Sequence, residues 1–474
     1  MSPAAIRHAY GFDQIALTDI HGNLVTSNGA GQTIAIVDAY DDPKIASDLH
    51  AFDQAYKLPD PPSLVIQKQF VGGKPPTVDG GWGVEIALDV EWAHAMAPGA
   101  NIVLAEAFNS SLNNLLTMVD WARSQSTVSA ISMSWGTNEF NGEAGYDSHF
   151  TTPPGHTGIT FVGASGDWGK PGIWPAYSPN VLAVGGTTLH LSTAGNYASE
   201  AGWNGSGGGT STYEQKPFYQ AGFDSTGFRD IPDVSYDADP ASGVAVYDTL
   251  NSNGWLVVGG TSAAAPQWAA LVAIANQGRV LAGTSALSGA QSVIDQLPAS
   301  DFHDVTTGNN GYQATAGYDL VTGRGTPLAN AVVRSLVAYT TSGSGKSSGV
   351  SSGYSSQTGT SSATVQVEIG VITADGPSNP GAPIEAAFAD LAPGAAVATV
   401  SAVGLPWVAT GQSFSPVLES SGGVAVAFPA SLAAGRLASL SAVDVCLADE
   451  LWAEESGTSD ATGESPAESS GADA

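Results

Sequence analysis

The sequence predicts an α/β fold, with a doubly wound, mostly parallel sheet and helices on both faces. Short apolar runs such as residues 33–37 and 101–105 are typical of strands that are covered on both faces. Segments with helical character, roughly 83–95 and 111–124, alternate with these runs. Strands that alternate with helices favour a parallel sheet built from strand–helix–strand units.

The later elements follow the same alternation. We expect further strands near 130–134, 159–163, 180–184, 243–247 and 255–258, and a closing helix near 326–338. The strand at 243–247 should continue the sheet toward Ser262.

Composition excludes several classes of function. The 474 residues hold 14 Lys and Arg against 44 Asp and Glu, a formal net charge of -30, which repels nucleic acid and anionic lipid. Cys446 is the single cysteine, so an intrachain disulfide is impossible. We expect no membrane span, since no apolar run approaches ~18 residues, and the N-terminus lacks the pattern of a signal peptide.

A change of composition marks the end of the α/β domain. We expect that domain over residues 1–340, a Gly/Ser/Thr-rich linker over 341–363, and a small C-terminal region of uncertain fold over 364–455. Residues 456–474 are acidic and lack apolar side chains, which is typical of a disordered tail. Within 364–455 we expect strands at 365–369 and 424–428 and a helix at 431–453.

Ser262 lies at a predicted strand-to-helix turn, in Gly259-Gly260-Thr261-Ser262-Ala263-Ala264-Ala265-Pro266. Free backbone N–H groups and the helix dipole favour negative charge at such a place, which suits a nucleophile. The two preceding glycines allow tight turns and the close approach of a substrate. The alternative is a serine that only caps a buried helix.

A serine nucleophile needs a proton acceptor, and histidine is the usual one. None of the eight histidines lies in a convincing motif. We expect His94 to be a surface or helix-end residue, and His149 and His303 to have similarly local roles.

Carboxylates are better candidates for the proton acceptor. Glu85 and Asp89 are four residues apart on a predicted helix and therefore share one face. Two acids so placed repel each other, and a shared proton relieves the repulsion and raises one pKa. An ordinary solvated helix face is the alternative.

Asp167 follows a predicted strand, so it should lie at the carboxyl edge of the sheet, where ligands collect in open α/β folds. A protonated aspartic acid there could donate a hydrogen bond to an oxyanion. A turn stabilised by the Asp side chain is the alternative.

Four motifs together resemble the sedolisin family of serine-carboxyl peptidases over residues 1–338. They are the helix with Glu85 and Asp89 that ends in Ala97-Pro98-Gly99-Ala100, then Ser132-Met133-Ser134-Trp135-Gly136, then Ser165-Gly166-Asp167-Trp168-Gly169, and finally Gly260-Thr261-Ser262-Ala263-Ala264-Ala265-Pro266.

The resemblance implies a subtilisin-like fold and an endopeptidase that cleaves peptide bonds through an acyl-enzyme on Ser262, mostly at acid pH. Glu85 would be the general base, and Asp89 would orient it and share its proton. Asp167 and the backbone N–H of Ser262 would form the oxyanion hole. These acids would titrate as a coupled set and give a bell-shaped pH profile.

The resemblance also implies one structural calcium ion. Its loop would supply the carboxylates of Asp304 and Asp319 and the carbonyls of Val305, Thr315 and Gly317, all of them hard oxygen ligands. Thr315 stands where the family usually has glycine.

Asp38 allows two further interpretations. In some sedolisins an acidic residue at this place extends the carboxylate network, with Trp135 as its neighbour. Asp38 could also be the aspartate of a histidine-based subtilisin-like serine protease, but the Gly-rich histidine motif of that class is missing.

Another hypothesis for the function of the whole chain is an inactive peptidase scaffold that displays a C-terminal binding region.

The remaining expectations follow from the resemblance. The partners would be polypeptide substrates and the enzyme's own N-terminal prodomain, and we expect this chain to be a form that lacks the prodomain. We expect a monomer that is secreted to the outside of the cell. Trp82, Trp135 and Trp168 flank the motifs and would either line subsites or pack in the core.

Overall fold

The computed structural model describes residues 1–222 and 226–340, together with 417–419 and 425–427. Its contacts divide the chain into two units, Met1–Lys346 and Ser347–Ala474. The expected linker at 341–363, the strand at 365–369, the helix at 431–453 and the tail at 456–474 lie outside the described residues. Of the second unit, strands β17 (Val417–Glu419) and β18 (Ala425–Ala427) are described, and they pair antiparallel.

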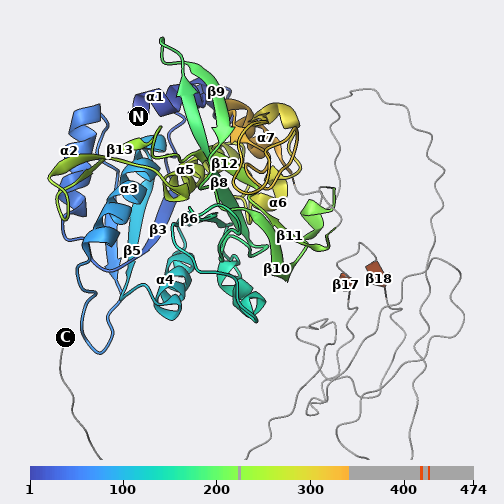
Figure 1. Ribbon diagram of the computed structural model, residues 1–474, viewed down its shortest axis with the longest axis horizontal. Coiled ribbons are helices and arrows are strands. Elements are labelled where there is room, and N and C mark those ends of the chain that lie inside the picture. The colour runs from blue at the N-terminus through green and yellow to red at the C-terminus, as the bar shows by residue number, and fades with distance from the viewer. Residues whose placement is uncertain (223–225, 341–416, 420–424, 428–474) are drawn as a thin grey trace, which may run out of the picture. The chain divides into compact units, whose positions relative to one another are not determined.

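The first unit is built on an eight-stranded sheet, in the order β12-β8-β7-β6-β3-β5-β4 with β9 added to β8 (Figure 1). All neighbours along this path are parallel, and β9 pairs antiparallel with β8. The strands are β3 (Thr33–Ala39), β4 (Leu64–Lys68), β5 (Asn101–Ala107), β6 (Val128–Met133), β7 (Thr160–Ala164), β8 (Val181–Leu191), β9 (Tyr197–Gly202) and β12 (Val234–Asp237). The predicted doubly wound, mostly parallel sheet is thus confirmed.

Helices cover both faces of this sheet. One face packs against α1 (Pro3–Ala9), α2 (Ile45–Tyr56), α3 (Gly80–Met96), α5 (Thr261–Leu281) and α7 (Ala329–Ala338). The other face packs against α4 (Leu112–Ser124) and η2 (Glu143–Phe150). The core therefore has two apolar layers, because successive side chains of each strand point to opposite faces.

Helix α3 lies side by side with α5 on the first face (Figure 1). Both helices are buried nearly all round, which explains why neither has a marked polar stripe. Asp79 begins α3 by accepting hydrogen bonds from the N–H groups of Gly81 and Trp82, both at 3.0 Å. Gly260 precedes α5 with φ at 113°, a conformation that favours glycine.

The prediction for residues 243–247 was wrong in its pairing. Strand β13 (Val244–Asp248) forms a separate antiparallel ribbon with β14 (Gly254–Val258) and packs over α2 and α3. The edge of the main sheet is instead β12, whose sequence Val-Ser-Tyr-Asp lacks the apolar pattern of the other strands. The closing helix α7 begins at Ala329, after the short strand β16 (Thr326–Pro327).

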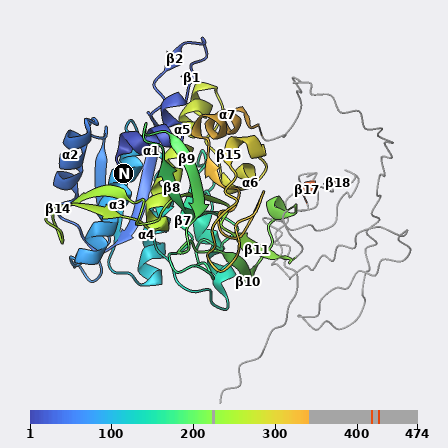
Figure 2. The same cartoon turned by 45° about the horizontal axis from the view of Figure 1, so that its top comes forward.

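Smaller elements complete the unit. The hairpin β1 (Leu17–Thr18) and β2 (Leu24–Val25) projects from the body in Figure 2. The others are η1 (Phe12–Gln14), β10 (Gly209–Gln215), η3 (Phe218–Gln220), β11 (Phe228–Ile231), α6 (Gln291–Ile294), η4 (Ala299–Asp301) and β15 (Phe302–His303). Among the described residues, no helix has the length and apolar character that a membrane span requires.

Because α5 is the central buried helix, we expect Leu271→Ala to lower the free energy of unfolding by about 2–5 kcal/mol. Leu271 is fully buried, so the change leaves a cavity between α5 and the sheet. Val280→Ala, at a position of the same helix that is 57% exposed, is the control and should change stability by less than about 0.5 kcal/mol. Urea unfolding followed by tryptophan fluorescence measures both, and equal effects would contradict the assigned core.

Candidate active site

Ser262 is the second residue of α5, directly after the turn that follows β14. Pro266 in the same helix has no N–H group, so the carbonyl of Ser262 lacks its usual helical partner four residues on. The hydroxyl of Ser134, just beyond the end of β6, donates to that carbonyl at 3.4 Å. The motifs of Ser134 and Ser262, which are far apart in the sequence, therefore meet at the backbone of Ser262. The order of the motifs in the sequence could not show this contact.

Glu85 on α3 is the carboxylate that meets Ser262. Burial raises the pKa of Glu85 to about 7, while a hydrogen bond with the Ser262 side chain opposes the rise and the charge of Asp167 adds to it. The Oε1 atom of Glu85 is buried without a hydrogen-bond partner. A carboxylate so placed gains from accepting the serine proton, because the protonated form is the one that burial favours.

Asp89 lies one helical turn from Glu85 and is fully buried. Burial, followed by the charges of Asp38 and Glu85, raises the pKa of Asp89 well above its usual range, and the hydroxyl of Ser134 opposes this rise. The two acids therefore do not lie on a solvated helix face. The charge of each ionised acid disfavours ionisation of the other, which favours a single negative charge on the two.

Asp167 lies beyond the end of β7 and reaches the first turn of α5. Its Oδ1 accepts hydrogen bonds from the N–H of Thr261 at 2.7 Å and from the Thr261 hydroxyl at 2.8 Å. The same hydroxyl accepts from the N–H of Gly166 at 3.0 Å. A Cβ at Gly260 would come within 2.7 Å of Asp167 Oδ2, so only glycine leaves room for this carboxyl beside the start of α5.

Thr261 and Ser134 lie at the site but were not predicted as site residues, although both belong to the motifs that resemble those of the sedolisin family. Each is a small hydroxyl residue that binds backbone or carboxyl groups, and such residues occur in many turns. Their position next to Ser262 and Asp167 was therefore a weak signal. The contacts show that Ser134 holds the backbone of Ser262 and that Thr261 holds the carboxyl of Asp167.

Asp38 is fully buried on β3, and neither of its carboxyl oxygens has a hydrogen-bond partner. Burial, then the charges of Glu85 and Glu106, raises the pKa of Asp38 well above its usual range. The indole N–H of Trp135 donates to the carbonyl of Val37 at 2.9 Å, so Trp135 is a neighbour of Asp38 through the backbone. Glu106, on the adjacent strand, was not predicted. The one signal for it was an acid inside the apolar run of β5.

The other two tryptophans differ in exposure. Trp82 is half-buried and packs against Tyr40, with 6.3 Å between ring centroids, whereas Trp168 is 92% exposed next to Asp167. Trp135 is buried.

The histidines take part in structural contacts. His94 ends α3 as predicted, but it is fully buried and not at the surface: its Nε2 donates to the carbonyl of Pro59 at 2.8 Å and lies 3.3 Å from Asp53. Burial follows from the packing of α2 on α3, which periodicity does not reveal. His303 stacks on Tyr197 at 3.8 Å between centroids.

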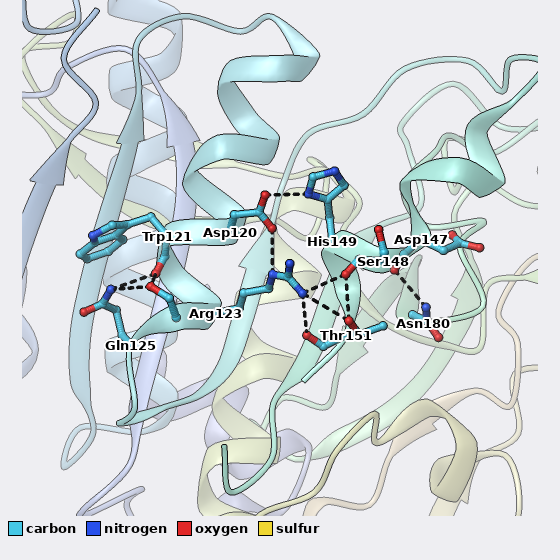
Figure 3. A network of polar contacts seen from close by, with 10 residues as sticks. Asp120, Trp121, Arg123, Gln125, Asp147, Ser148, His149, Thr151 and Asn180 are labelled. Atoms are coloured by element: carbon cyan, nitrogen blue, oxygen red, sulfur yellow. Dashed lines mark hydrogen bonds and ion pairs between the residues drawn. The ribbon is translucent and has the colours of Figure 1, made fainter. Parts of the chain in front are cut away.

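His149 joins η2 to α4. Figure 3 shows its ring against Asp120 of α4, at 2.9 Å, beside Arg123, which donates to the carbonyls of Ser148 and Thr151. The local role expected for this histidine agrees with these contacts.

The predicted metal loop is brought together in part. The carboxylate of Asp304 accepts from the N–H of Gly317 at 3.1 Å, and that of Asp319 accepts from the N–H of Thr315 at 2.8 Å. Two carboxylates thus face one short loop, and hard oxygen atoms of this kind fit Ca²⁺. No group of three or more His, Cys, Asp or Glu side chains suited to a metal occurs among the described residues, so backbone carbonyls and water would have to supply the other ligands.

Comparisons with known proteins agree with this arrangement. The model of the subtilase family matches residues 83–284. Kumamolisin of Bacillus sp. (strain MN-32) is 32% identical over 352 residues, which are 65% of this chain and 61% of kumamolisin. Sedolisin of Pseudomonas sp. (strain 101) is 39% identical over 168 residues, which are 32% of this chain and 28% of sedolisin. The chain therefore spans less than two thirds of these relatives.

A solved structure of Pseudomonas sedolisin, a serine-carboxyl proteinase complexed with two molecules of pseudo-iodotyrostatin, superposes with a TM-score of 0.61 at 28% identity. The match covers 70% of this chain and 96% of that one, so it extends over nearly the whole of the solved enzyme. Together with the sequence matches, it shows that the chain is similar in sequence and in fold to serine-carboxyl peptidases of the sedolisin type.

Proposed function

We propose that the chain is an acid-acting serine-carboxyl endopeptidase. The observation that most supports this is the hydrogen bond between Ser262 and the buried carboxylate of Glu85. A histidine-based mechanism is disfavoured, because His8, His50, His94 and His149 bind groups other than Ser262.

In the first half of the reaction, the Oγ of Ser262 attacks the carbonyl carbon of the scissile peptide bond while Glu85 takes its proton. The carbonyl π electrons move onto oxygen and give a tetrahedral oxyanion. Asp167, when protonated, and the backbone N–H of Ser262 donate hydrogen bonds to this oxyanion. Glu85 then returns the proton to the leaving nitrogen, the C–N bond breaks, and an acyl ester remains on Ser262.

In the second half, water attacks the ester carbonyl and Glu85 accepts a proton from it. The new oxyanion collapses, the C–O bond to Ser262 breaks, and the proton passes back to the serine oxygen. Asp89 lies beside Glu85 throughout and can hold the shared proton of the pair.

Acid conditions are supported by a second group of carboxyls, away from Ser262. Glu139 faces Glu143, and Asp147 faces Glu214, each pair closely enough to hydrogen-bond. Two carboxyl groups can hydrogen-bond to each other only if one is protonated. Burial raises the pKa of Glu143 and of Glu214 to about 8 and that of Asp147 to about 6.

We include in the proposal a structural calcium ion at the loop of Asp304 and Asp319, with carbonyls of Val305, Thr315 and Gly317. When bound, it would tie two segments of the loop together through oxygen ligands. We also include secretion into an acidic environment, which the acid-stabilised carboxyl pairs support. The prodomain and the monomeric state stay predictions.

Replacement of the nucleophile is the decisive test. We expect Ser262→Ala to lower kcat for a peptide substrate at about pH 4 by at least about a thousandfold, because no acyl-enzyme can form. Glu85→Gln should have a similar effect, since an amide cannot take the proton. Ser47→Ala, an exposed serine on α2, is the control and should match the wild type. Equal hydrolysis by wild type and Ser262→Ala would favour the inactive scaffold.

Stability should fall as the pH rises from about 4 to about 8. In the unfolded chain Glu143 ionises near its usual pKa of about 4.3, but in the folded protein only near about 8. Below pH about 4.3, Glu143 is protonated in both the folded and the unfolded state, and the free energy of unfolding is at its highest with respect to this group. Between about 4.3 and about 8 only the unfolded state releases the proton, so the free energy of unfolding decreases as the pH rises.

Thermal unfolding of two variants checks this. The stability of Glu143→Gln, measured relative to that of the wild type, should be higher at pH 8 than at pH 4. Asp60→Asn, which removes a carboxyl that is 62% exposed and pairs with His50, should show a much smaller gain, because both partners are exposed to solvent. A wild-type melting temperature that rises from pH 4 to pH 8 would contradict the assignment.

Removal of calcium should destabilise the protein. At about one hundred times its Kd, a bound ion adds about 2.7 kcal/mol to the free energy of unfolding, so EGTA should lower the melting temperature. Asp304→Asn should lose this response. Asp301→Asn is the matched control, because Asp301 lies close in sequence but accepts from Ser335, and it should keep the response. An unchanged melting temperature in EGTA would contradict the site.

A further inference from the structure

Three side chains form a polar row across adjacent strands of the sheet. The register places Asp38 of β3 opposite Glu106 of β5, and Glu106 opposite Lys68 of β4. Side chains of directly opposed residues point to the same face of a sheet. The row therefore runs from the middle of the sheet to its edge strand, where Lys68 is 30% exposed.

The row lies on the face that α3 covers. Ile36 on β3 and Leu104 on β5, each two residues before a member of the row, belong to the same apolar cluster as α3. Since the side chains of a strand alternate between its two faces, Asp38 and Glu106 point to this side too. Glu85 and Asp89 are on α3, and the charge of Glu85 acts on Asp38.

The two acids of the row differ in their partners. Asp38 has no hydrogen-bond donor for either oxygen, which makes an ionised Asp38 costly. Glu106 accepts from the N–H of Asp42 at 3.1 Å, and its Oε2 lies 3.7 Å from Lys68 Nζ, which also contacts Asp41. Negative charge is therefore better accommodated on Glu106 than on Asp38.

We propose that Glu106, held by Lys68, is a positioning residue of this peptidase, which keeps Asp38 protonated and so preserves the shared proton of Glu85 and Asp89. The inference rests on the proposed function for its effect on catalysis. Glu106 would influence catalysis only through Asp38 and the acids of α3, because Glu106 touches neither Ser262 nor the reacting atoms.

The charged groups around the row support the proposed effect of Glu106 on the protonation of Asp38. Asp38 faces Glu85 and Asp89 on α3 and Glu106 on β5; Glu106 faces Lys68 on β4 and, in the loop after β3, Asp41 and Asp42. Burial raises the pKa of Glu106 to about 7, and the N–H of Asp42 and the charge of Lys68 oppose the rise. An ionised Glu106 then repels a second negative charge on Asp38 and raises the pKa of Asp38.

The test is Glu106→Gln in the full chain, which removes the neighbouring charge and keeps the shape. The proton of Asp38 should be lost at a pH lower by about one unit, because a like charge on the directly opposed residue of the neighbouring strand shifts a buried acid by this order. ¹³C NMR of protein labelled at the aspartate carboxyls, with the Asp38 signal assigned by Asp38→Asn, measures the titration. In the same variant, the alkaline limb of kcat/KM should move to lower pH.

Glu91→Gln is the matched control. Glu91 is also a fully buried glutamate, on α3, but it accepts from the N–H of Tyr247 at 3.0 Å and lies outside the row. Glu91→Gln should change neither the pH at which Asp38 loses its proton nor the pH profile of kcat/KM. A loss of activity without a shift of the profile would indicate a merely structural role for Glu106.

Lys68→Met is a second variant in case Glu106→Gln does not fold. Without the cation, Glu106 stays protonated to higher pH, so Asp38 should again lose its proton earlier, by a smaller amount because Lys68 lies one strand further away. An Asp38 titration that is unchanged in both variants overturns the inference, as does a shifted titration with an unchanged pH profile. Inactive wild-type protein would instead refute the proposed function, and the NMR titration would still decide whether Glu106 controls Asp38.

Discussion

The packing of α3 against α5 is the contact on which the site depends. Both helices are largely buried, so Asp89 faces protein and not water, and the Ser262 side chain at the start of α5 hydrogen-bonds Glu85 on α3. A carboxylate without water is an unstable anion that binds a proton strongly. The same packing that stabilises the fold thus raises the pKa of Glu85 to about 7.

The position of Ser262 relative to that base is fixed by side chains from several strand ends. Ser134 follows β6 and holds the carbonyl that Pro266 leaves without a helical partner, and Asp167 follows β7 and binds Thr261. These residues converge because the carboxyl ends of parallel strands lie along one edge of the sheet. The arrangement fixes the backbone on both sides of Ser262, which is the kind of positioning that the proposed nucleophile requires.

Desolvated acids recur beyond the active site, in the row of Asp38 and Glu106 and in the pairs around Glu143 and Glu214. The chain has few basic residues with which to neutralise such groups, since 14 Lys and Arg stand against 44 Asp and Glu. Protonation is therefore the main way to make buried carboxyls compatible with an apolar interior. Low pH should consequently stabilise the folded chain at these positions.

The sequence by itself determined the features that depend on local geometry: the alternation of strands and helices, the helix start at Ser262, and the common face of Glu85 and Asp89, which follows from 3.6 residues per turn. It also contained the motifs of the sedolisin family. Only the tertiary structure decided that β13 leaves the main sheet, that His94 is buried, and that Asp38 lies opposite Glu106. Strand partners, burial and register arise from contacts between segments far apart in the chain, and periodicity along one segment does not record which other segment will cover it.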